Sequence, residues 1–146
     1  MIGKKIFEYE LDVVRVTDSG VSLEEVLSGN TKIPLSGVRV DVAFEGQAKG
    51  DIAGRVYGVD YIQIRPDGSI LLDIRAMIET TDGHRIAISA DGRATASPTT
   101  PVAQLRENIS LSTASEKYQW LNAHQIWGVG QVDFSTQKIL IEAYMQ

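Results

Sequence analysis

Apolar and polar side chains alternate with a period of two along most of the chain. The alternation is clearest over residues 4–16, 38–45 and 69–79. Successive side chains of a β-strand point to opposite faces of the sheet, so each of these segments is typical of a strand with one buried face. An amphipathic helix would instead repeat every 3.6 residues. The dominant period therefore predicts an all-β fold.

Five further segments show the same alternation with more interruptions, which brings the expected total to about eight strands. They are residues 52–65, 85–96, 103–112, 120–133 and 138–144. Three Asp-Gly pairs, at residues 67–68, 82–83 and 91–92, are strong hairpin signals because glycine accepts positive φ. Strands of about 10–13 residues joined by hairpins favour a single antiparallel up-and-down β-barrel over a short-stranded sandwich.

Short helical turns are expected at two places. Ser22 and Glu25 have the spacing of a helix-capping box, and Gly29 offers a stop. Residues 115–118 are suited to a second turn. The Ser-Pro-Thr-Thr-Pro stretch at 97–101 has the composition of a surface loop, in a position to cover a barrel mouth.

Composition narrows the functional classes. A chain of 146 residues without a linker or repeat is expected to form one domain over residues 1–146. The formal net charge of −5 argues against nucleic-acid binding, which needs a basic face. The absence of cysteine excludes disulfides and thiolate metal sites, and His84 and His124 cannot build a three-histidine site. We therefore expect neither a metal nor a cofactor.

Membrane and secretion signals are missing from the sequence. No apolar run approaches the roughly 18 residues of a membrane-spanning helix. The first residues alternate in polarity and lack the uninterrupted apolar stretch of a signal peptide. We expect a cytoplasmic protein with no membrane partner.

Polar side chains interrupt three apolar rows. Asp60 shares a face with Ile62, Glu107 lies between buried-type residues of 103–112, and Asn122 and His124 follow Trp120 in the row of 120–126. Burying an unpaired carboxylate is costly, so such groups are normally paired, protonated or exposed to a wet cavity. In a closed barrel these side chains would share one interior and form an apolar pocket with a few polar groups, the usual form of a small-molecule site.

Each of these residues also has a structural interpretation. A β-bulge at residues 58–59 would turn Asp60 outward. A register shift or a strand-end position would do the same for Glu107. His124 is suited to a hydrogen-bonded structural role, and Trp120 to filling the core or the barrel mouth. Both alternatives stay open at the level of sequence.

No named catalytic motif occurs in the chain. General acid–base chemistry by His124 together with Glu107 or Asp60 is compatible with the pattern, because burial tunes such groups toward neutral pH.

Five motifs follow one another in the second part of the chain. They are GVDY at 58–61, RPDGSILLDIR at 65–75, TTDGHRI at 80–86, YQWLN at 118–122 and GVG at 128–130. In order and spacing, over about residues 38–144, they resemble a family of small bacterial proteins known as domain of unknown function 3237. The resemblance implies a lipocalin-like or streptavidin-like β-barrel and no established activity.

The same resemblance points to particular residues. The family's acidic position matches Asp60, its Asp-x-Arg stretch matches Asp73 and Arg75, and its Trp-Leu-Asn stretch matches 120–122. Tyr61 stands where the family pattern has tryptophan, at a pocket wall. An inward Arg75 would bind an anionic ligand group. The alternation instead places Asp73 and Arg75 on the solvated face of their strand, so their orientation stays open.

Three functional hypotheses follow. The leading one is a barrel that binds a small, partly apolar organic molecule. The second is an enzyme (isomerase, cyclase or lyase) that uses acid–base residues of the same pocket. The third is a structural module that forms a homodimer through an exposed strand edge or the Trp127 face. The candidate ligand-binding residues are Asp60, Tyr61, Asp73, Arg75, Glu107, Trp120, Asn122 and His124, and the catalytic candidates among them are His124, Glu107 and Asp60.

Overall fold

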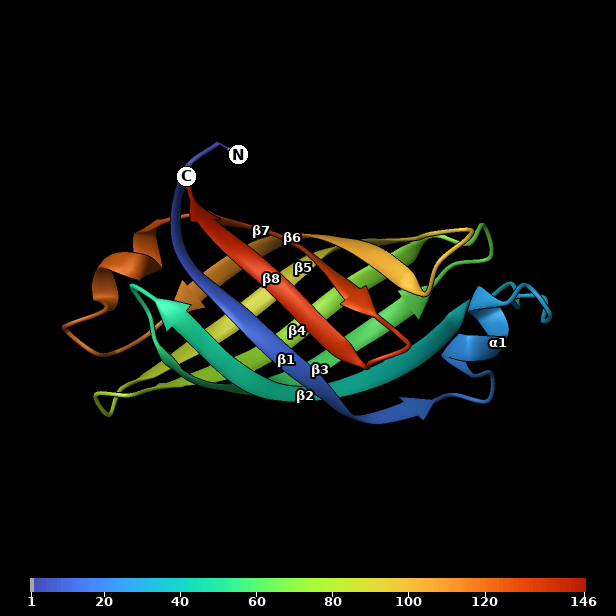
Figure 1. The fold of residues 1–146 in the computed structure, drawn as a ribbon, viewed down its shortest axis with the longest axis horizontal. Coiled ribbons are helices and arrows are strands. Elements are labelled where there is room, and N and C mark those ends of the chain that lie inside the picture. The colour runs from blue at the N-terminus through green and yellow to red at the C-terminus, as the bar shows by residue number, and fades with distance from the viewer. Residues whose placement is uncertain (1) are drawn as a thin grey trace.

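Eight antiparallel strands form a closed barrel in the computed structural model, which describes residues 2–146. The strands pair in chain order, and the last pairs with the first (Figure 1). This confirms the predicted up-and-down barrel. The strands are β1 (Lys4–Asp18), β2 (Val38–Gly50), β3 (Gly54–Ile64), β4 (Ile70–Thr80), β5 (Arg85–Ala96), β6 (Val102–Ser112), β7 (Ile126–Asp133) and β8 (Lys138–Met145).

Every strand presents one row of side chains to the barrel interior. In β6 each second residue is buried, from Ala103 to Leu111, and the residues between them are exposed. In β1 a bulge at Val14 shifts the register with β2, and Val14 itself is exposed. The bulge reverses the alternation, so that Val13 and Val16 both face the interior.

Two short helices lie at opposite ends of the barrel (Figure 1). Helix α1 (Leu23–Leu27) begins at Ser22, whose Oγ accepts a hydrogen bond of 3.0 Å from the backbone N–H of Glu25. This is the cap that the sequence predicts. Within residues 2–146, no helix has the length and apolarity needed to cross a lipid bilayer.

The second helical element, η1 (Gln119–Ala123), is a 3₁₀ turn. It lies just after the predicted turn at 115–118. The strand predicted over 120–133 is therefore wrong at its start, because the chain is helical there and β7 begins only at Ile126.

The barrel interior has a packed half and a hollow half. We call the end near η1 the packed half, because its inward side chains are fully buried against one another; they include Phe7, Ile52, Val56, Ile78, Ile86 and Leu121. The end near α1 is the hollow half, where the inward side chains line a cavity. Leu121 of η1 is buried, whereas α1 contributes no buried residue.

A cluster of polar side chains fixes η1 to the packed end. Asp82 in the β4–β5 turn accepts hydrogen bonds from the Thr80 hydroxyl (2.6 Å) and the Tyr118 hydroxyl (2.9 Å), and it pairs with Lys117. These contacts, with Lys117 first, hold the pKa of Asp82 well below its usual range. The Ser115 hydroxyl and His84 Nδ1 lie 2.8 Å apart beside this cluster.

Asp91-Gly92 is not the turn that its sequence predicts. Gly92 lies inside β5 and pairs with Glu107 of β6. A Cβ atom at Gly92 would lie 2.9 Å from Glu107 Cα and would collide with the Arg106 carbonyl oxygen. The glycine allows close approach of two strands instead of a reversal of the chain.

We expect Gly92→Ala to destabilise the barrel by about 3 kcal/mol, because the added methyl group would force the β5 and β6 backbones apart. Gly83→Ala is the matched control: Gly83 has a positive φ in a turn, but no heavy atom lies within 4 Å of the place that a Cβ would take. It should cost about 1 kcal/mol, from the backbone conformation alone. Urea unfolding measures both. Equal destabilisation by the two variants would contradict the close approach of β5 and β6.

Candidate functional site

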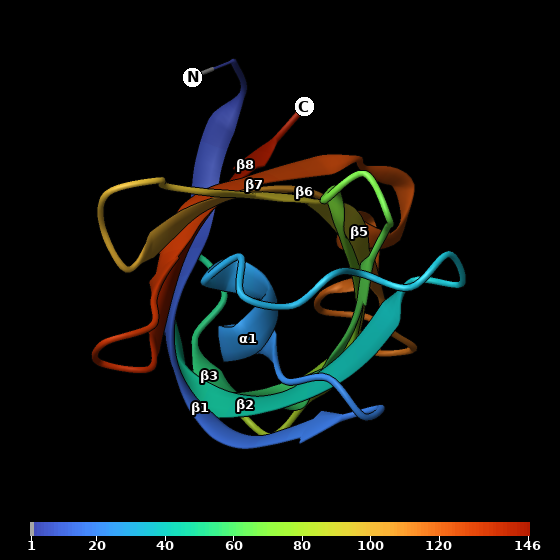
Figure 2. The same cartoon turned by 90° about the vertical axis from the view of Figure 1, so that its right-hand side faces the viewer.

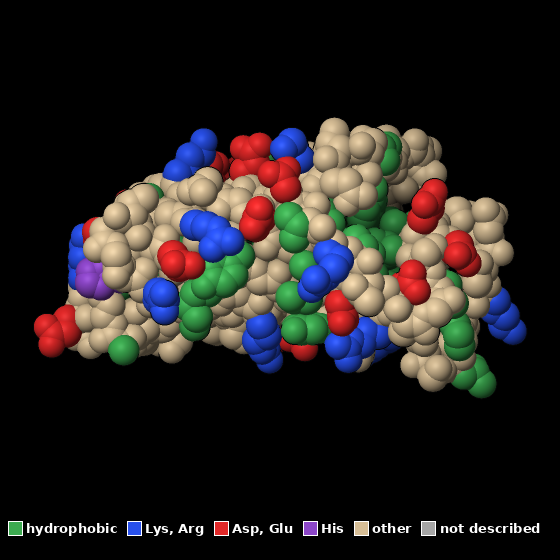
Figure 3. All heavy atoms as spheres, turned by 90° about the horizontal axis from the view of Figure 1, so that it is seen from below, with side chains coloured by type: hydrophobic (Ala, Val, Ile, Leu, Met, Phe, Trp, Pro, Cys, Tyr) green, Lys and Arg blue, Asp and Glu red, His purple; other side chains and the backbone are tan. Residues whose placement is uncertain are grey.

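The hollow half encloses a cavity of about 680 Å³ that opens beside α1. Apolar side chains from many strands form its wall, among them Leu11, Val42, Ile62, Leu72 and Leu105. Figure 2 shows α1 in front of the barrel opening. In Figure 3, hydrophobic side chains lie at the bottom of a hollow toward this end of the molecule, with Asp and Glu side chains around it.

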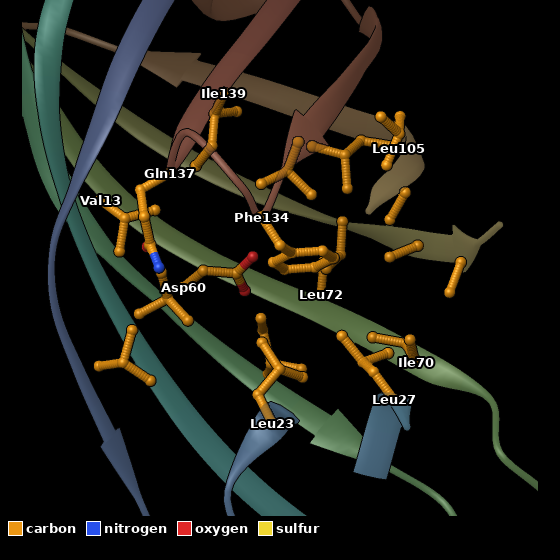
Figure 4. A pocket seen from close by; sticks show the side chains of 18 of the residues that line it. Val13, Leu23, Leu27, Asp60, Ile70, Leu72, Leu105, Phe134, Gln137 and Ile139 are labelled. Carbon is orange, nitrogen blue, oxygen red and sulfur yellow. The ribbon is translucent and has the colours of Figure 1, made fainter. Parts of the chain in front are cut away.

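Three segments border the mouth of the cavity. Leu23 and Leu27 reach it from α1, and Phe134 from the β7–β8 turn (Figure 4). The loop between β5 and β6 borders it at Thr100 and Pro101. Each of these segments connects strands or follows a strand end, so the mouth is built from loops and the wall from the sheet.

The cavity floor lies where the hollow half meets the packed half, and it carries three polar side chains. On each of their strands, Tyr9 of β1, Asp60 of β3 and Glu107 of β6 are the cavity-lining residues nearest to the packed half. The Tyr9 hydroxyl donates a hydrogen bond of 3.3 Å to Glu107 Oε1. Because β1 and β6 are not neighbours in the sheet, this bond crosses the barrel interior.

Asp60 occupies a gap in the backbone pairing of β3 and β4. The ladder pairs Asp60 with Ile74 and resumes at Gln63 with Leu71. Between these pairs, the backbone N–H of Asp73 donates a hydrogen bond of 3.0 Å to Asp60 Oδ1. The inward orientation of Asp60 follows from an unbroken β2–β3 register, without the bulge at residues 58–59 that would have reversed it.

The apolar surroundings favour the neutral forms of both carboxyl groups. Burial and the nearby charge of Asp60 raise the pKa of Glu107, the Tyr9 hydrogen bond lowers it, and the net value is about 8. Burial also raises the pKa of Asp60, the N–H of Asp73 lowers it, the carboxylate of Asp73 raises it, and the net value is about 7. Near neutral pH, Glu107 therefore keeps its proton while Asp60 is divided between both forms.

One oxygen of each carboxyl group is open to the cavity. Among residues 2–146, no side chain or backbone group donates to Glu107 Oε2 or Asp60 Oδ2. Every fully buried side-chain polar atom in this part of the chain has a hydrogen-bond partner. The two oxygens are therefore accessible, and Figure 4 shows the Asp60 carboxyl pointing into the cavity.

Trp120, Asn122 and His124 lie outside the cavity, at the opposite end of the barrel. Trp120 is 42% exposed, and Asn122 and His124 are also exposed. Asn122 exchanges hydrogen bonds of 2.8 and 3.0 Å with the backbone of Thr113. Their predicted inward row is wrong because the alternation of a strand was counted through η1, where the chain is helical.

Tyr61, Asp73 and Arg75 lie on the outer face of the barrel. Arg39 stacks over the Tyr61 ring, with its guanidinium carbon 5.2 Å from the ring centre. Arg75 donates a 2.7 Å hydrogen bond to Ser89 Oγ and lies 3.2 Å from Asp73 Oδ1. The alternation assigned the faces of Asp73 and Arg75 correctly, so an inward Arg75 with an anionic ligand does not fit the structure.

Sequence reasoning missed several residues of this site. Tyr9 lies in the alternating segment 4–16, but its partner across the barrel is not visible in the sequence. Leu23, Leu27 and Phe134 gave no signal, because their place at the mouth depends on how loops fold back over the barrel. No group of three His, Asp or Glu side chains within residues 2–146 is arranged to hold a metal ion.

Solved structures share this fold. A β-barrel-like protein from Acinetobacter baumannii AYE is 20% identical, with a TM-score of 0.79 over 98% of this chain and 94% of that chain. A protein of unknown function from Clostridium acetobutylicum is 22% identical, with a TM-score of 0.81 over 100% and 99%. An enzyme from Penicillium herquei is 20% identical, with a TM-score of 0.66 over 98% and 92%. At these identities the similarity shows the fold alone.

Residues 21–146 match the family described as Protein of unknown function (DUF3237). No curated protein matches the chain.

The buried acids should make the barrel less stable as pH rises. Glu107 and Asp60 bind protons more tightly in the folded chain than in the unfolded chain, so the folded state carries more protons between about pH 4 and pH 8. The free energy of unfolding should then fall from pH 5 to pH 9. Glu107→Gln removes its share of this decrease, on the order of 4 kcal/mol.

Urea unfolding at pH 5 and pH 9 measures the effect. Glu116→Gln, at an exposed position far from the cavity floor, should leave the wild-type difference unchanged. A pH dependence that is the same in Glu107→Gln and in the wild type would show that Glu107 is not buried as a neutral acid.

Proposed function

The chain belongs to the DUF3237 family, and we propose that its barrel binds a small, partly apolar organic molecule in the hollow half. One observation carries this proposal. An apolar cavity of about 680 Å³ is interrupted at its floor by the free oxygens of Asp60 and Glu107. Small-molecule sites typically occupy about 300–1,000 Å³, with apolar walls and few polar groups.

The apolar wall and the polar floor of the cavity would act differently on a ligand. Apolar contact with side chains such as Leu72 and Leu105 supplies affinity without fixing direction, because the hydrophobic effect is non-directional. The open oxygens of Asp60 and Glu107 favour a ligand group that can hydrogen-bond with them. A ligand with an apolar body and one polar end suits this arrangement.

The segment that carries α1 offers a route for entry. It leaves the barrel at Ser19 and returns at Arg39, where the Ser19 N–H donates to the Arg39 carbonyl (3.1 Å) and the Arg39 N–H to Ser19 Oγ (3.2 Å). Between these residues, the hydrogen bonds of α1 and its caps stay within the segment. Displacing α1 therefore breaks no backbone bond of the barrel.

The proposal predicts a retained mass of a few hundred daltons in native mass spectrometry of freshly purified protein.

It also predicts saturable binding of the neutral fluorophore N-phenyl-1-naphthylamine. Ala94→Trp places a large ring in the cavity wall and should weaken fluorophore binding at least about tenfold, because it fills the space that the ligand needs. Trp120→Ala, outside the cavity, should bind like the wild type. Equal affinity of Ala94→Trp and the wild type would place the bound molecule elsewhere.

A second candidate function is acid–base catalysis in the same cavity. It is favoured by two carboxyl groups whose proton affinities differ near neutral pH, since such pairs supply a general acid and a general base. Glu107 would donate a proton and Asp60 would accept one. His124, exposed at the other end of the barrel, has no part in this candidate.

For a substrate that turns over, the rate should follow a bell-shaped pH profile with limbs near pH 7 and pH 8. Asp60→Asn should lower kcat by at least about a hundredfold, because an amide cannot accept the proton. His124→Gln should leave the profile unchanged. Full activity of Asp60→Asn would exclude Asp60 as the base.

A homodimer, the third hypothesis, is proposed here through the Trp127 face. All eight strands are paired on both sides, so none of the described strands is free along a whole edge, although β1 continues to Asp18 beyond its last pair with β8 at Asp12. The outward ring of Trp127 is 37% exposed and offers an apolar contact instead. The assembly peak in the native mass spectrum distinguishes a dimer from a monomer.

A further inference from the structure

Within residues 2–146, every Asp, Glu, Lys, Arg or His side chain that lines the cavity is acidic. Asp18 and Glu24 lie at the mouth, and Asp60 and Glu107 lie at the floor. Within residues 2–146, no lysine, arginine or histidine lines it. Basic residues that adjoin the floor residues in the sheet, such as Arg75, which pairs with Val59, and Arg106, project from the outer face of their strands.

This distribution of acidic side chains favours cationic ligands over anionic ones. Charges within an apolar, water-poor space interact more strongly than charges in bulk water. A carboxylate or phosphate ligand would meet only acidic groups, with no cation to compensate it. A cation would meet acidic groups both on entry and at the floor.

The floor itself is suited to a donor. Glu107 is 7% exposed, and its Oε2 and the Oδ2 of Asp60 have no donor of their own among residues 2–146. Figure 4 shows the Asp60 carboxyl directed into the cavity. Two open acceptor oxygens in an apolar cavity are complementary to an ammonium group, which carries several N–H donors.

We infer that the hollow half binds a hydrophobic amine, whose ammonium group donates to the free oxygens of Asp60 and Glu107 and whose apolar part contacts the cavity wall. This inference rests on the proposed function, because it names the chemical class of the ligand at that site.

Binding of a protonated amine should release protons from the protein, whereas binding of a neutral ligand should not. An alkylamine is already protonated in neutral water, so it brings a positive charge into the cavity. This positive charge stabilises the ionised form of the carboxyl groups beside it, so Glu107 and the protonated fraction of Asp60 release their protons to the solvent. The other titratable groups at the floor are the Tyr9 hydroxyl, which stays protonated because burial raises its pKa, and Asp73, whose side chain lies outside.

Three probes with the same eight-carbon chain test the inference: octylamine, 1-octanol and octanoate. In titration calorimetry at pH 7.5 and low salt, octylamine should bind at least about tenfold more tightly than 1-octanol, and octanoate should bind most weakly. Repeating the octylamine titration in phosphate and in Tris, which differ in ionisation enthalpy, should show about one proton released per amine bound. The 1-octanol titration should show none.

A double variant, Asp60→Asn with Glu107→Gln, removes both charges and keeps the size and hydrogen-bonding shape of the neutral acids, so it should fold. It should lose the preference for octylamine and the proton release, while its affinity for 1-octanol stays within about threefold of the wild type. The matched control, Asp12→Asn with Glu116→Gln, removes two charges from the exterior and should keep the preference.

The outcomes separate the inference from the proposed function. Equal affinity for octylamine and 1-octanol, or tightest binding of octanoate, overturns the amine while leaving a ligand-binding barrel. Retention of the preference in the double variant also overturns it. If none of the three probes binds, both the inference and the proposed function are contradicted.

Discussion

Closure of the sheet is the constraint on which the rest of this structure depends. Because β8 pairs with β1, each strand has two neighbours and its side chains must face either the solvent or one shared interior. What fills that interior is decided at the two ends of the barrel. At one end η1 inserts the buried side chain of Leu121, and at the other α1 covers the opening without burying a residue. A packed half and a hollow half follow from this difference.

The polar layer of Tyr9, Asp60 and Glu107 lies at the border between the two halves. In a fully packed interior, two carboxyl groups would be among the most costly side chains to place. Here each group has one oxygen bound by the protein and one open to the cavity. Two strong hydrogen-bonding groups thus lie in an apolar space, and no fully buried side-chain polar atom of residues 2–146 is left unpaired.

The sequence predicted what alternation and turn chemistry control. The barrel, the cap at Ser22 and the inward faces of Asp60 and Glu107 all follow from local patterns. The wrong orientations predicted for Trp120, Asn122 and His124 also have a local cause. Residues 119–123 form a 3₁₀ turn, which changes which side chains share a face, and the composition of this segment did not indicate the turn. The turn predicted at Gly92 was wrong because residue type alone does not distinguish a glycine that lets two strands approach closely from a glycine that forms a hairpin turn. The cross-barrel bond from Tyr9 to Glu107 depends on three-dimensional closure, so no pattern along the chain predicts it.

The division of the interior has a consequence for how such a barrel diverges. A side chain in the packed half has neighbours on every side, so shortening it leaves a void that the surroundings cannot fill. A side chain that already borders the cavity loses fewer contacts, and its exchange mainly changes the shape of the open space. Mutation is therefore tolerated most where it alters what fits inside. Lineages that share this architecture can therefore change the shape of the cavity at one end while the packed end preserves the fold.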